Sequence, residues 1–287
     1  MAADLSRASS RKQSQQRQVF TFFVQDMMFG LAVENVLMLG QDVDKIQNVP
    51  VEEQGFCGVT KFQGVVVPVI DFAHRLGVAS GLDIKKQLLD KLNQLEREHL
   101  EWVRNLTQSL LHSETFSLDL EAGDCSSSLW LRQFTCRDES LNELIHACCE
   151  PHQQLHDSGV AALAQTYSED PQALAKQFQQ QANIHLQRLR ALGQRAKEQL
   201  ESDMRQVLLF VTDDGKTPRY ALLLDEIHDV ISYDIDEFQS SSAGALAQIR
   251  KIRAILSGIF SRDDHPDCLF FDIDKLADSD LVADHQI

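Results

Sequence analysis

Long apolar runs, surplus basic charge and a regular cysteine framework are all missing from this 287-residue sequence. The longest apolar candidate, residues 65–70, contains Pro68 and falls far short of the roughly 18–20 residues that a membrane-crossing helix needs. The 27 basic residues are outnumbered by 43 acidic ones, and the formal charge of -16 repels phosphate backbones and anionic lipid surfaces. We therefore expect neither membrane insertion nor nucleic-acid binding.

The cysteines and the first residues both favour a cytoplasmic protein. Six cysteines, including the adjacent Cys148 and Cys149, show no regular spacing, which is typical of free thiols in a reducing compartment. Residues 1–16 are rich in Ser, Gln and Arg and have no apolar core segment. This composition predicts a disordered tail and not a signal peptide.

A strand–turn–strand pattern occurs twice, far apart in the chain. Apolar strands are expected at 19–24 and 31–36 around a turn at 26–30, and again at 206–211 and 222–227 around a turn at 213–216. Each copy later reaches an apolar strand that contains an acid, at 65–72 and 269–273. An internal repeat of short strands and polar turns is typical of small barrels or sandwiches. The sequence thus predicts a β domain formed by residues 17–84 and 204–287.

Between the two copies the apolar period changes from two to about 3.6, which predicts helices. One apolar stripe runs through residues 85–111, and a second helical stretch covers 140–164, with Pro151 marking a kink or a new start. A third helix is expected to begin at Pro171, with Asp170 as its N-cap. We interpret residues 85–203 as a helical bundle inserted into the β domain.

Four residues of the predicted bundle are of types that bind zinc. His152 and His156 are four apart on one helical face, His99 occupies the apolar stripe of the first helix, and Cys125 would complete a tetrahedral set. Core histidines held by hydrogen bonds and an incidental thiol are the competing interpretation, because each residue alone is common in helical cores.

The sequence around these ligands resembles the chemoreceptor zinc-binding (CZB) domain. The similar segments are His99-Leu100-Glu101-Trp102, Cys125 with Trp130 five residues on, and Pro151-His152-Gln153-Gln154-Leu155-His156. The resemblance covers about residues 85–165 and implies a four-helix bundle that holds zinc through three histidines and one cysteine. Ser126-Ser127-Ser128 stands where that family often has Phe-Gly or Leu-Gly.

The two β segments resemble CheW, the chemotaxis coupling protein, and this resemblance implies two SH3-like five-stranded barrels. It includes Gly58-Val59 and the run from Gly64 to Asp71. The family's receptor-contacting Asn-Leu-Arg-Gly turn is Lys61-Phe62-Gln63-Gly64 here, so Lys61, Gln63 and Gly64 are the implied partner contacts. Gln63 cannot replace the planar charge of Arg.

Together the two resemblances imply a non-enzymatic cytoplasmic adaptor that couples methyl-accepting chemoreceptors to a CheA-type histidine kinase. The zinc module would sense zinc or oxidants through Cys125, or would hold a purely structural ion. Association of two copies through the helical bundle is a further expectation.

Two other functions are weighed against the adaptor. A zinc-dependent hydrolase would use Glu150 or Asp157 as a base, but His-Glu-x-x-His is absent and four protein ligands leave no position for water. Gly215-Lys216-Thr217 suggests a phosphate-binding loop, yet Phe210 stands where that loop needs its first glycine. A hairpin turn is the expected structure there.

Overall fold

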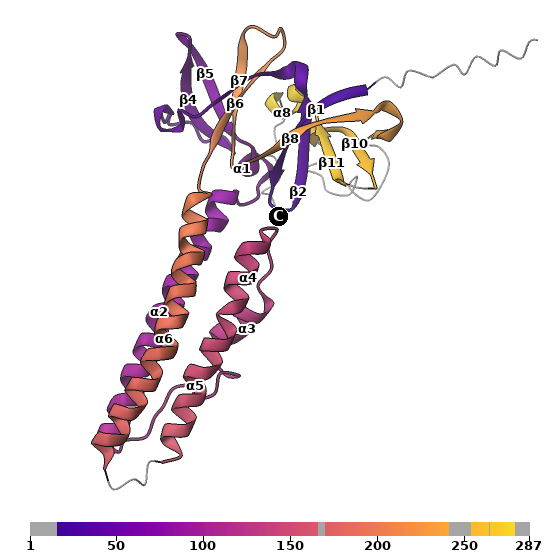
Figure 1. Cartoon of the computed structure of the whole chain (residues 1–287). Coiled ribbons are helices and arrows are strands. Elements are labelled where there is room, and N and C mark those ends of the chain that lie inside the picture. The colour runs from indigo at the N-terminus through magenta and orange to yellow at the C-terminus, as the bar shows by residue number, and fades with distance from the viewer. Residues whose placement is uncertain (1–15, 166–169, 241–253, 264, 279–287) are drawn as a thin grey trace, which may run out of the picture. The chain divides into compact units, whose positions relative to one another are not determined.

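The computed structural model describes residues 16–165, 170–240, 254–263 and 265–278 and divides into two compact units (Figure 1). The β unit comprises residues 1–82 and 205–287, and the helical unit comprises residues 83–204. Strands in the outer segments and helices between them confirm the expected β plus α class. The predicted tail at residues 1–16 lies outside the described residues, apart from Gln16.

Within the described residues, the strands of the β unit form two sheets. One has six strands in the order β8-β1-β2-β11-β10-β9, and the other has five in the order β3-β6-β7-β5-β4. The strands from the first segment are Gln16–Val24 (β1), Met27–Ala32 (β2), Val36–Gly40 (β3), Phe56–Phe62 (β4) and Val65–Asp71 (β5). Those from the second are Val207–Thr212 (β6), Pro218–Leu224 (β7), Glu226–Asp234 (β8), Phe238–Ser240 (β9), Leu256–Arg262 (β10) and His265–Phe271 (β11).

The internal repeat is present, but its two hairpins are exchanged. The orders β8-β1-β2-β11-β10 and β3-β6-β7-β5-β4 correspond strand by strand, and in each the third and fourth strands pair in parallel. The β1–β2 hairpin thus lies among strands of the second segment, and the β6–β7 hairpin lies among strands of the first. Each sheet therefore depends on both chain segments, which the sequence repeat alone does not indicate.

The two sheets pack on one shared hydrophobic core. Alternate side chains of β1 and of β7 face it, because successive side chains of a strand point to opposite sides. At its centre, the ring of Phe22 lies edge-on to that of Phe72 with their centroids 4.9 Å apart, and both side chains are fully buried. This packing joins residues from both ends of the chain into one unit.

Three sequence-predicted boundaries are wrong, each for a local reason. The strand predicted to reach Phe72 ends at Asp71, whose carboxylate accepts a hydrogen bond from the His74 N–H (2.9 Å) and caps α1 (Phe72–Leu76). The strand predicted over 269–273 ends likewise at Phe271, before α8 (Ile273–Asp278). The first turn is shorter than expected, and Gly30 lies inside β2, where an added Cβ would collide with Val19 and Cys268.

The helical unit contains Gly81–His112 (α2) from its third residue on, then Ser126–Gln133 (α3), Glu139–Ala147 (α4), Cys149–Leu163 (α5) and Pro171–Ser202 (α6). Asp170 caps α6 by accepting a hydrogen bond from the Ala173 N–H (3.0 Å), as the sequence predicts. The stretch predicted as 140–164 is two helices. Pro151 lies in the first turn of α5, where its missing N–H leaves no backbone bond unmade, so it marks a new start and not a kink.

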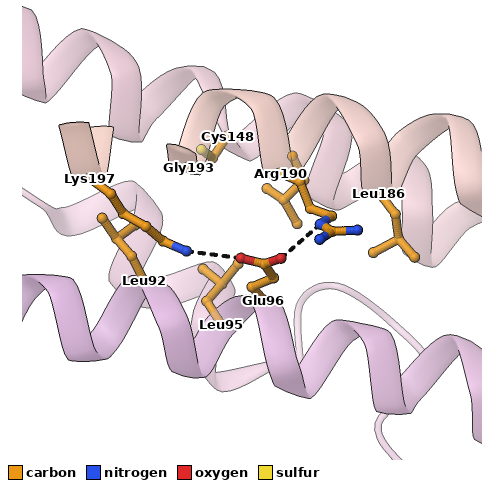
Figure 2. Close-up of a pocket in the computed structure, with 9 residues that line it drawn as sticks. Leu92, Leu95, Glu96, Cys148, Leu186, Arg190, Gly193 and Lys197 are labelled. Atoms are coloured by element: carbon orange, nitrogen blue, oxygen red, sulfur yellow. Dashed lines mark hydrogen bonds and ion pairs between the residues drawn. The ribbon is translucent and has the colours of Figure 1, made fainter. Parts of the chain in front are cut away.

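The two long helices, α2 and α6, are joined by charged side chains (Figure 2). Glu96 of α2 accepts hydrogen bonds from Arg190 Nε (2.7 Å) and Lys197 Nζ (2.9 Å) of α6. Below these bonds the side chains of Leu92 and Leu95 are buried. Ion pairs and apolar packing together fix the register of α2 against α6.

Within the β unit, Asp225 binds both places at which the chain passes to the helical unit. Its carboxylate accepts a hydrogen bond from the Gly81 N–H (2.7 Å) and another from Gln206 Nε2 (2.7 Å). Asp225 lies between β7 and β8, so one side chain fastens both ends of the inserted segment. No helix of the described residues is long and apolar enough to cross a membrane.

Candidate metal centre

The candidate site is a polar layer between two apolar clusters of the helical unit. Along α2, Leu92 and Leu95 belong to one cluster and Trp102 and Leu106 to the other, with His99 between them. His99 is 2% exposed, and His152 and His156 of α5 are each 1% exposed. Three buried histidines in one layer require a compensating interaction, because burying a polar nitrogen without a partner is costly.

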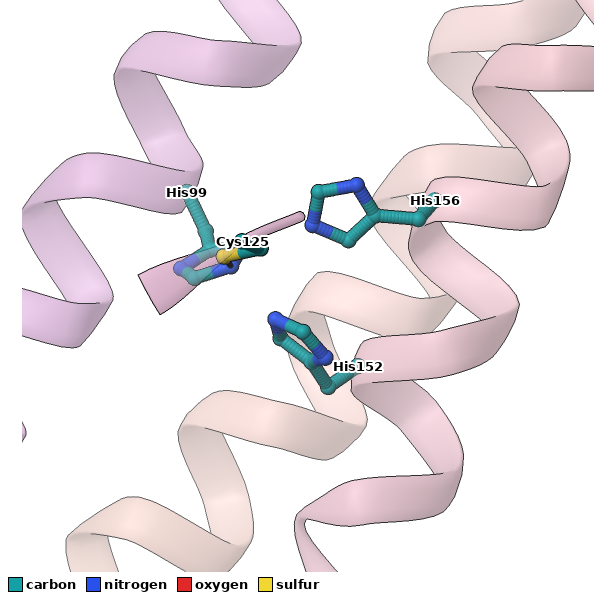
Figure 3. A group of neighbouring side chains, drawn as sticks. All are labelled: His99, Cys125, His152 and His156. Atoms are coloured by element: carbon teal, nitrogen blue, oxygen red, sulfur yellow. Dashed lines mark hydrogen bonds between the residues drawn. The ribbon is translucent and has the colours of Figure 1, made fainter. Parts of the chain in front are cut away.

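The structure brings all four sequence-predicted ligands together (Figure 3). One ligand atom from each of His99, Cys125, His152 and His156 lies within 4.8 Å of the others. Cys125 Sγ is 3.7 Å from His99 Nε2, and the ring centroids of His152 and His156 are 4.8 Å apart. Zinc bonds of about 2.0–2.3 Å place tetrahedral ligands roughly 3.3–3.8 Å apart, so the cluster is close to this spacing.

Main-chain carbonyls fix which nitrogen of two rings faces inward. The Nδ1 of His99 lies 2.7 Å from the Leu95 carbonyl oxygen, and the Nδ1 of His156 lies 2.8 Å from that of Leu120. A carbonyl accepts only from a protonated Nδ1, so Nε2 keeps its lone pair and turns toward the cluster. The Nε2 atoms of His152 and His156 are buried and have no hydrogen-bond partner.

The histidines are held in the neutral form that binds metal. Burial lowers the pKa of His99 and His156, and burial together with the neighbouring histidines lowers that of His152 to about 3. Lone pairs on the rings are therefore available at neutral pH. A metal ion is the ligand that such unpaired, converging lone pairs fit, and imidazole with thiolate is the donor set that zinc prefers.

Cys125 reaches the cluster from outside the long helices. It is the N-cap residue of α3, and its side chain makes no capping hydrogen bond. The first turn of a helix presents free N–H groups, which favour a negatively charged sulfur nearby. Cys125 is half-buried, whereas the three histidines are buried, so it is the most exposed residue of the four.

The predicted bases of a hydrolase are exposed and hydrogen-bonded within their own helix. Asp157 accepts a hydrogen bond from Gln153 (2.9 Å) and Glu150 accepts one from Gln154 (3.0 Å), and both carboxylates belong to exposed residues. With four protein donors in place, the cluster offers no open position for water. This geometry favours a structural or regulatory ion over a catalytic one.

The residues implied as partner contacts form the exposed turn between β4 and β5. Gln63 and Gly64 have φ values of 47° and 86°, as a two-residue hairpin requires, and Lys61 is exposed beside them. Lys61 and Gln63 line a groove of about 680 Å³ in the five-stranded sheet, which we call the β3–β4 groove. Its apolar lining is Met38, Ile46, Val59, Phe62, Val66, Leu208 and Phe210. Sequence reasoning missed this surface, since alternation along a strand does not reveal which exposed apolar residues gather in space.

The Gly215-Lys216-Thr217 segment is a hairpin turn, as expected. The carboxylate of Asp214 accepts hydrogen bonds from the N–H groups of Lys216 (2.8 Å) and Thr217 (2.7 Å). The N–H groups that a phosphate-binding loop would direct at its ligand are thus already paired here.

No family model matches the sequence, and no curated protein matches it. Among solved structures, the chain is similar to the scaffolding protein TtCheW from Thermoanaerobacter tengcongensis, with a TM-score of 0.42 and 12% sequence identity. The alignment covers 93% of this chain and 95% of that one.

Proposed function

We propose that the chain is a cytoplasmic chemotaxis adaptor in which a zinc-binding, CZB-like helical unit modulates a CheW-like β unit. The observation that carries the proposal is the cluster of His99, Cys125, His152 and His156, with its buried unpaired nitrogens. The exchanged repeat of the β unit and the sequence resemblance to CheW support the adaptor half. Both halves of the proposal are testable separately.

The four donors hold zinc and thereby join three separate elements. His99 comes from α2, His152 and His156 from α5, and Cys125 from the start of α3. Because one ion fixes all three, its loss loosens the packing of the helical unit. Zinc here supplies structural cross-linking and keeps the bound sulfur deprotonated.

Cys125 is the residue through which an oxidant acts in this proposal. Hypochlorous acid chlorinates the thiolate sulfur with release of hydroxide, water then displaces chloride to give a sulfenic acid, and the oxidised sulfur is a poor zinc ligand. A fall in free zinc reaches the same state by dissociation. Both inputs convert a cross-linked helical unit into a looser one.

The β unit docks a CheA-type histidine kinase through the β3–β4 groove. Val66 is 58% exposed and Met38 is 43% exposed, so the groove presents apolar side chains to a partner. Chemoreceptor contact would involve Lys61, Gln63 and Gly64. Because Gln63 offers no cation, kinase docking is the stronger of the two proposed contacts.

Metal content of the untagged protein tests the zinc half. Mass spectrometry of the native chain is expected to show one zinc per chain, lost in Cys125→Ser and after a short hypochlorous acid pulse. Cys136→Ser is the matched control, because Cys136 lies outside the cluster and its sulfur donates to the Asp138 carbonyl. Absence of zinc from the wild type, or equal loss in both variants, would contradict the switch.

Binding to a purified CheA-type kinase tests the adaptor half. Val66→Asp places a charge in the apolar groove and is expected to weaken binding by more than about fivefold, as for a central interface residue. Val230→Asp is the control, since Val230 is 46% exposed on β8, in the other sheet. Equal binding of both variants and the wild type would remove the groove from the proposal.

A further inference from the structure

The Trp102 side chain is packed in a fixed position beside the candidate metal cluster. It follows His99 by less than one helical turn on α2 and is 6% exposed. Its ring lies 4.6 Å from that of His156, centroid to centroid. On α5, Gly159 leaves room for the indole, because a Cβ at that position would collide with it. Packing against His156 and Gly159 thus fixes the direction of the indole N–H.

The indole N–H binds the segment that carries the sulfur. Trp102 Nε1 donates to the carbonyl oxygen of Asp119 (2.8 Å), and His156 Nδ1 faces the next carbonyl, that of Leu120 (2.8 Å). Two rings that touch each other therefore hold two consecutive peptide groups of the connection between α2 and α3. A ligand ring and its neighbour act on the same short piece of chain.

Only a tight turn separates these two peptide groups from Cys125. The Asp124 N–H donates to the Glu121 carbonyl (3.1 Å), and the Cys125 N–H donates to the Ala122 carbonyl (3.3 Å). Ala122 is 1% exposed, so the turn is anchored in the interior. A displacement at Asp119 is therefore passed to the sulfur, whereas His99 and His152 are held by their own helices.

We propose that Trp102 is a positioning residue for the sulfur ligand, acting through the Asp119 carbonyl. This inference rests on the proposed function, since it assumes that the cluster binds metal. It assigns to Trp102 an effect on the ligands that depend on residues 119–125, chiefly Cys125. Removing the N–H should disturb sulfur ligation most, affect His156 less through the neighbouring Leu120 carbonyl, and leave His99 and His152 in place.

Cobalt(II) in place of zinc distinguishes the two kinds of ligand. Thiolate bound to cobalt gives a near-ultraviolet charge-transfer band, and the visible bands report the tetrahedral site as a whole. Trp102→Phe keeps an aromatic ring against His156 but removes the hydrogen bond to Asp119. Trp130→Phe is the matched control, because Trp130 is the chain's other tryptophan and packs on Phe134, the residue that follows α3.

The expected result is a weaker charge-transfer band relative to the visible bands in Trp102→Phe, with cobalt affinity lowered about 10- to 100-fold, the usual effect of losing a group that orients a ligand. Trp130→Phe should match the wild type. Wild-type affinity and band ratio in Trp102→Phe would overturn the inference, as would a uniform loss of all bands in folded protein. A wild type that binds no cobalt or zinc would instead overturn the proposed function.

A second measurement does not depend on the folding of Trp102→Phe. In the Trp130→Phe protein, emission comes from Trp102 alone. Zinc should shift this emission, and Cys125→Ser in the same background should reduce the shift, because the indole N–H and the sulfur share one segment. An emission spectrum unchanged by bound zinc would count against the inference.

Discussion

Replacing Glu96 by Gln should destabilise the helical unit more than any exposed charge replacement on α2. Glu96 accepts from both Arg190 and Lys197, and Gln keeps its size while removing the charge. The Lys197 side chain is only 12% exposed and would lose its counter-charge. The variant therefore tests whether the ion pairs in Figure 2 stabilise the α2–α6 contact.

The expected loss in the free energy of unfolding follows from how exposed each ion pair is. A hydrogen bond between charged groups contributes about 1.5–3 kcal/mol, and an exposed ion pair about 0–1 kcal/mol. The Arg190 side chain is 55% exposed, which places its pair in the weak class, whereas the Lys197 pair is mostly buried. We expect Glu96→Gln to lower the free energy of unfolding by about 1.5–2.5 kcal/mol at neutral pH.

The effect should depend on pH with a defined sign. The hydrogen bond from Lys197 is the main cause that lowers the pKa of Glu96, and burial opposes it. A carboxyl group with a lowered folded pKa stabilises the fold above its unfolded pKa of about 4.3, and this stabilisation is lost as the pH falls through the folded pKa. The gap between wild type and Glu96→Gln should therefore close in acid.

Tryptophan fluorescence provides the assay, because both tryptophans of the chain, Trp102 and Trp130, lie in the helical unit. Urea unfolding with a chelator present removes any metal contribution. Glu101→Gln is the control: the Glu101–Arg104 pair lies on the same helix at 3.7 Å, with both side chains more than half exposed. Equal destabilisation by the two variants, or a gap that persists undiminished in acid, would refute the reasoning.

Three further perturbations have defined outcomes. Phe22→Ala should cost the β unit about 3–5 kcal/mol, because a fully buried ring between the sheets is lost, and hydrogen exchange of β6 and β7 amides measures it. Gly58→Ala should speed exchange at the paired amides of Gln47 and Val59, since φ is 128° and an added Cβ would strike the Gln47 carbonyl; protection equal to wild type would contradict this. In Cys125→Ser, any zinc affinity of the three histidines should fall with acid only at a pH below that at which free imidazole titrates, about 6.5, because burial lowers the pKa of each ring; a chelator competition series that falls already at pH 7 would contradict it.

The elements of this fold were largely predictable where a local signal exists. Asp170 followed by Pro171 predicts the start of α6, because an acceptor side chain before a residue without an N–H suits the first turn of a helix. The exchange of hairpins was not predictable. Alternating apolar residues specify which face of a strand is buried and not which strand lies beside it.

In the candidate site, too, the ligand residues were predictable from the sequence and the groups that orient them were not. The spacing of His152 and His156 places both rings on one helical face, and residue type suggests the metal. The inward direction of Nε2 depends on the Leu95 and Leu120 carbonyls. Every residue has a carbonyl, so the sequence carries no mark of the ones that orient a ligand.

The two bonds accepted by Asp225 also bear on how such a chain could be assembled. Gly81 and Gln206 bind the two oxygens of one carboxylate. The two points at which the chain leaves and re-enters the β unit therefore lie close together. Closing a longer loop between two chain positions that are held together costs only slightly more entropy than closing a short one. A short Gly-Ser bridge or an unrelated helical segment with adjacent ends should therefore join the same two residues, which makes this junction a suitable place for exchanging one inserted segment for another.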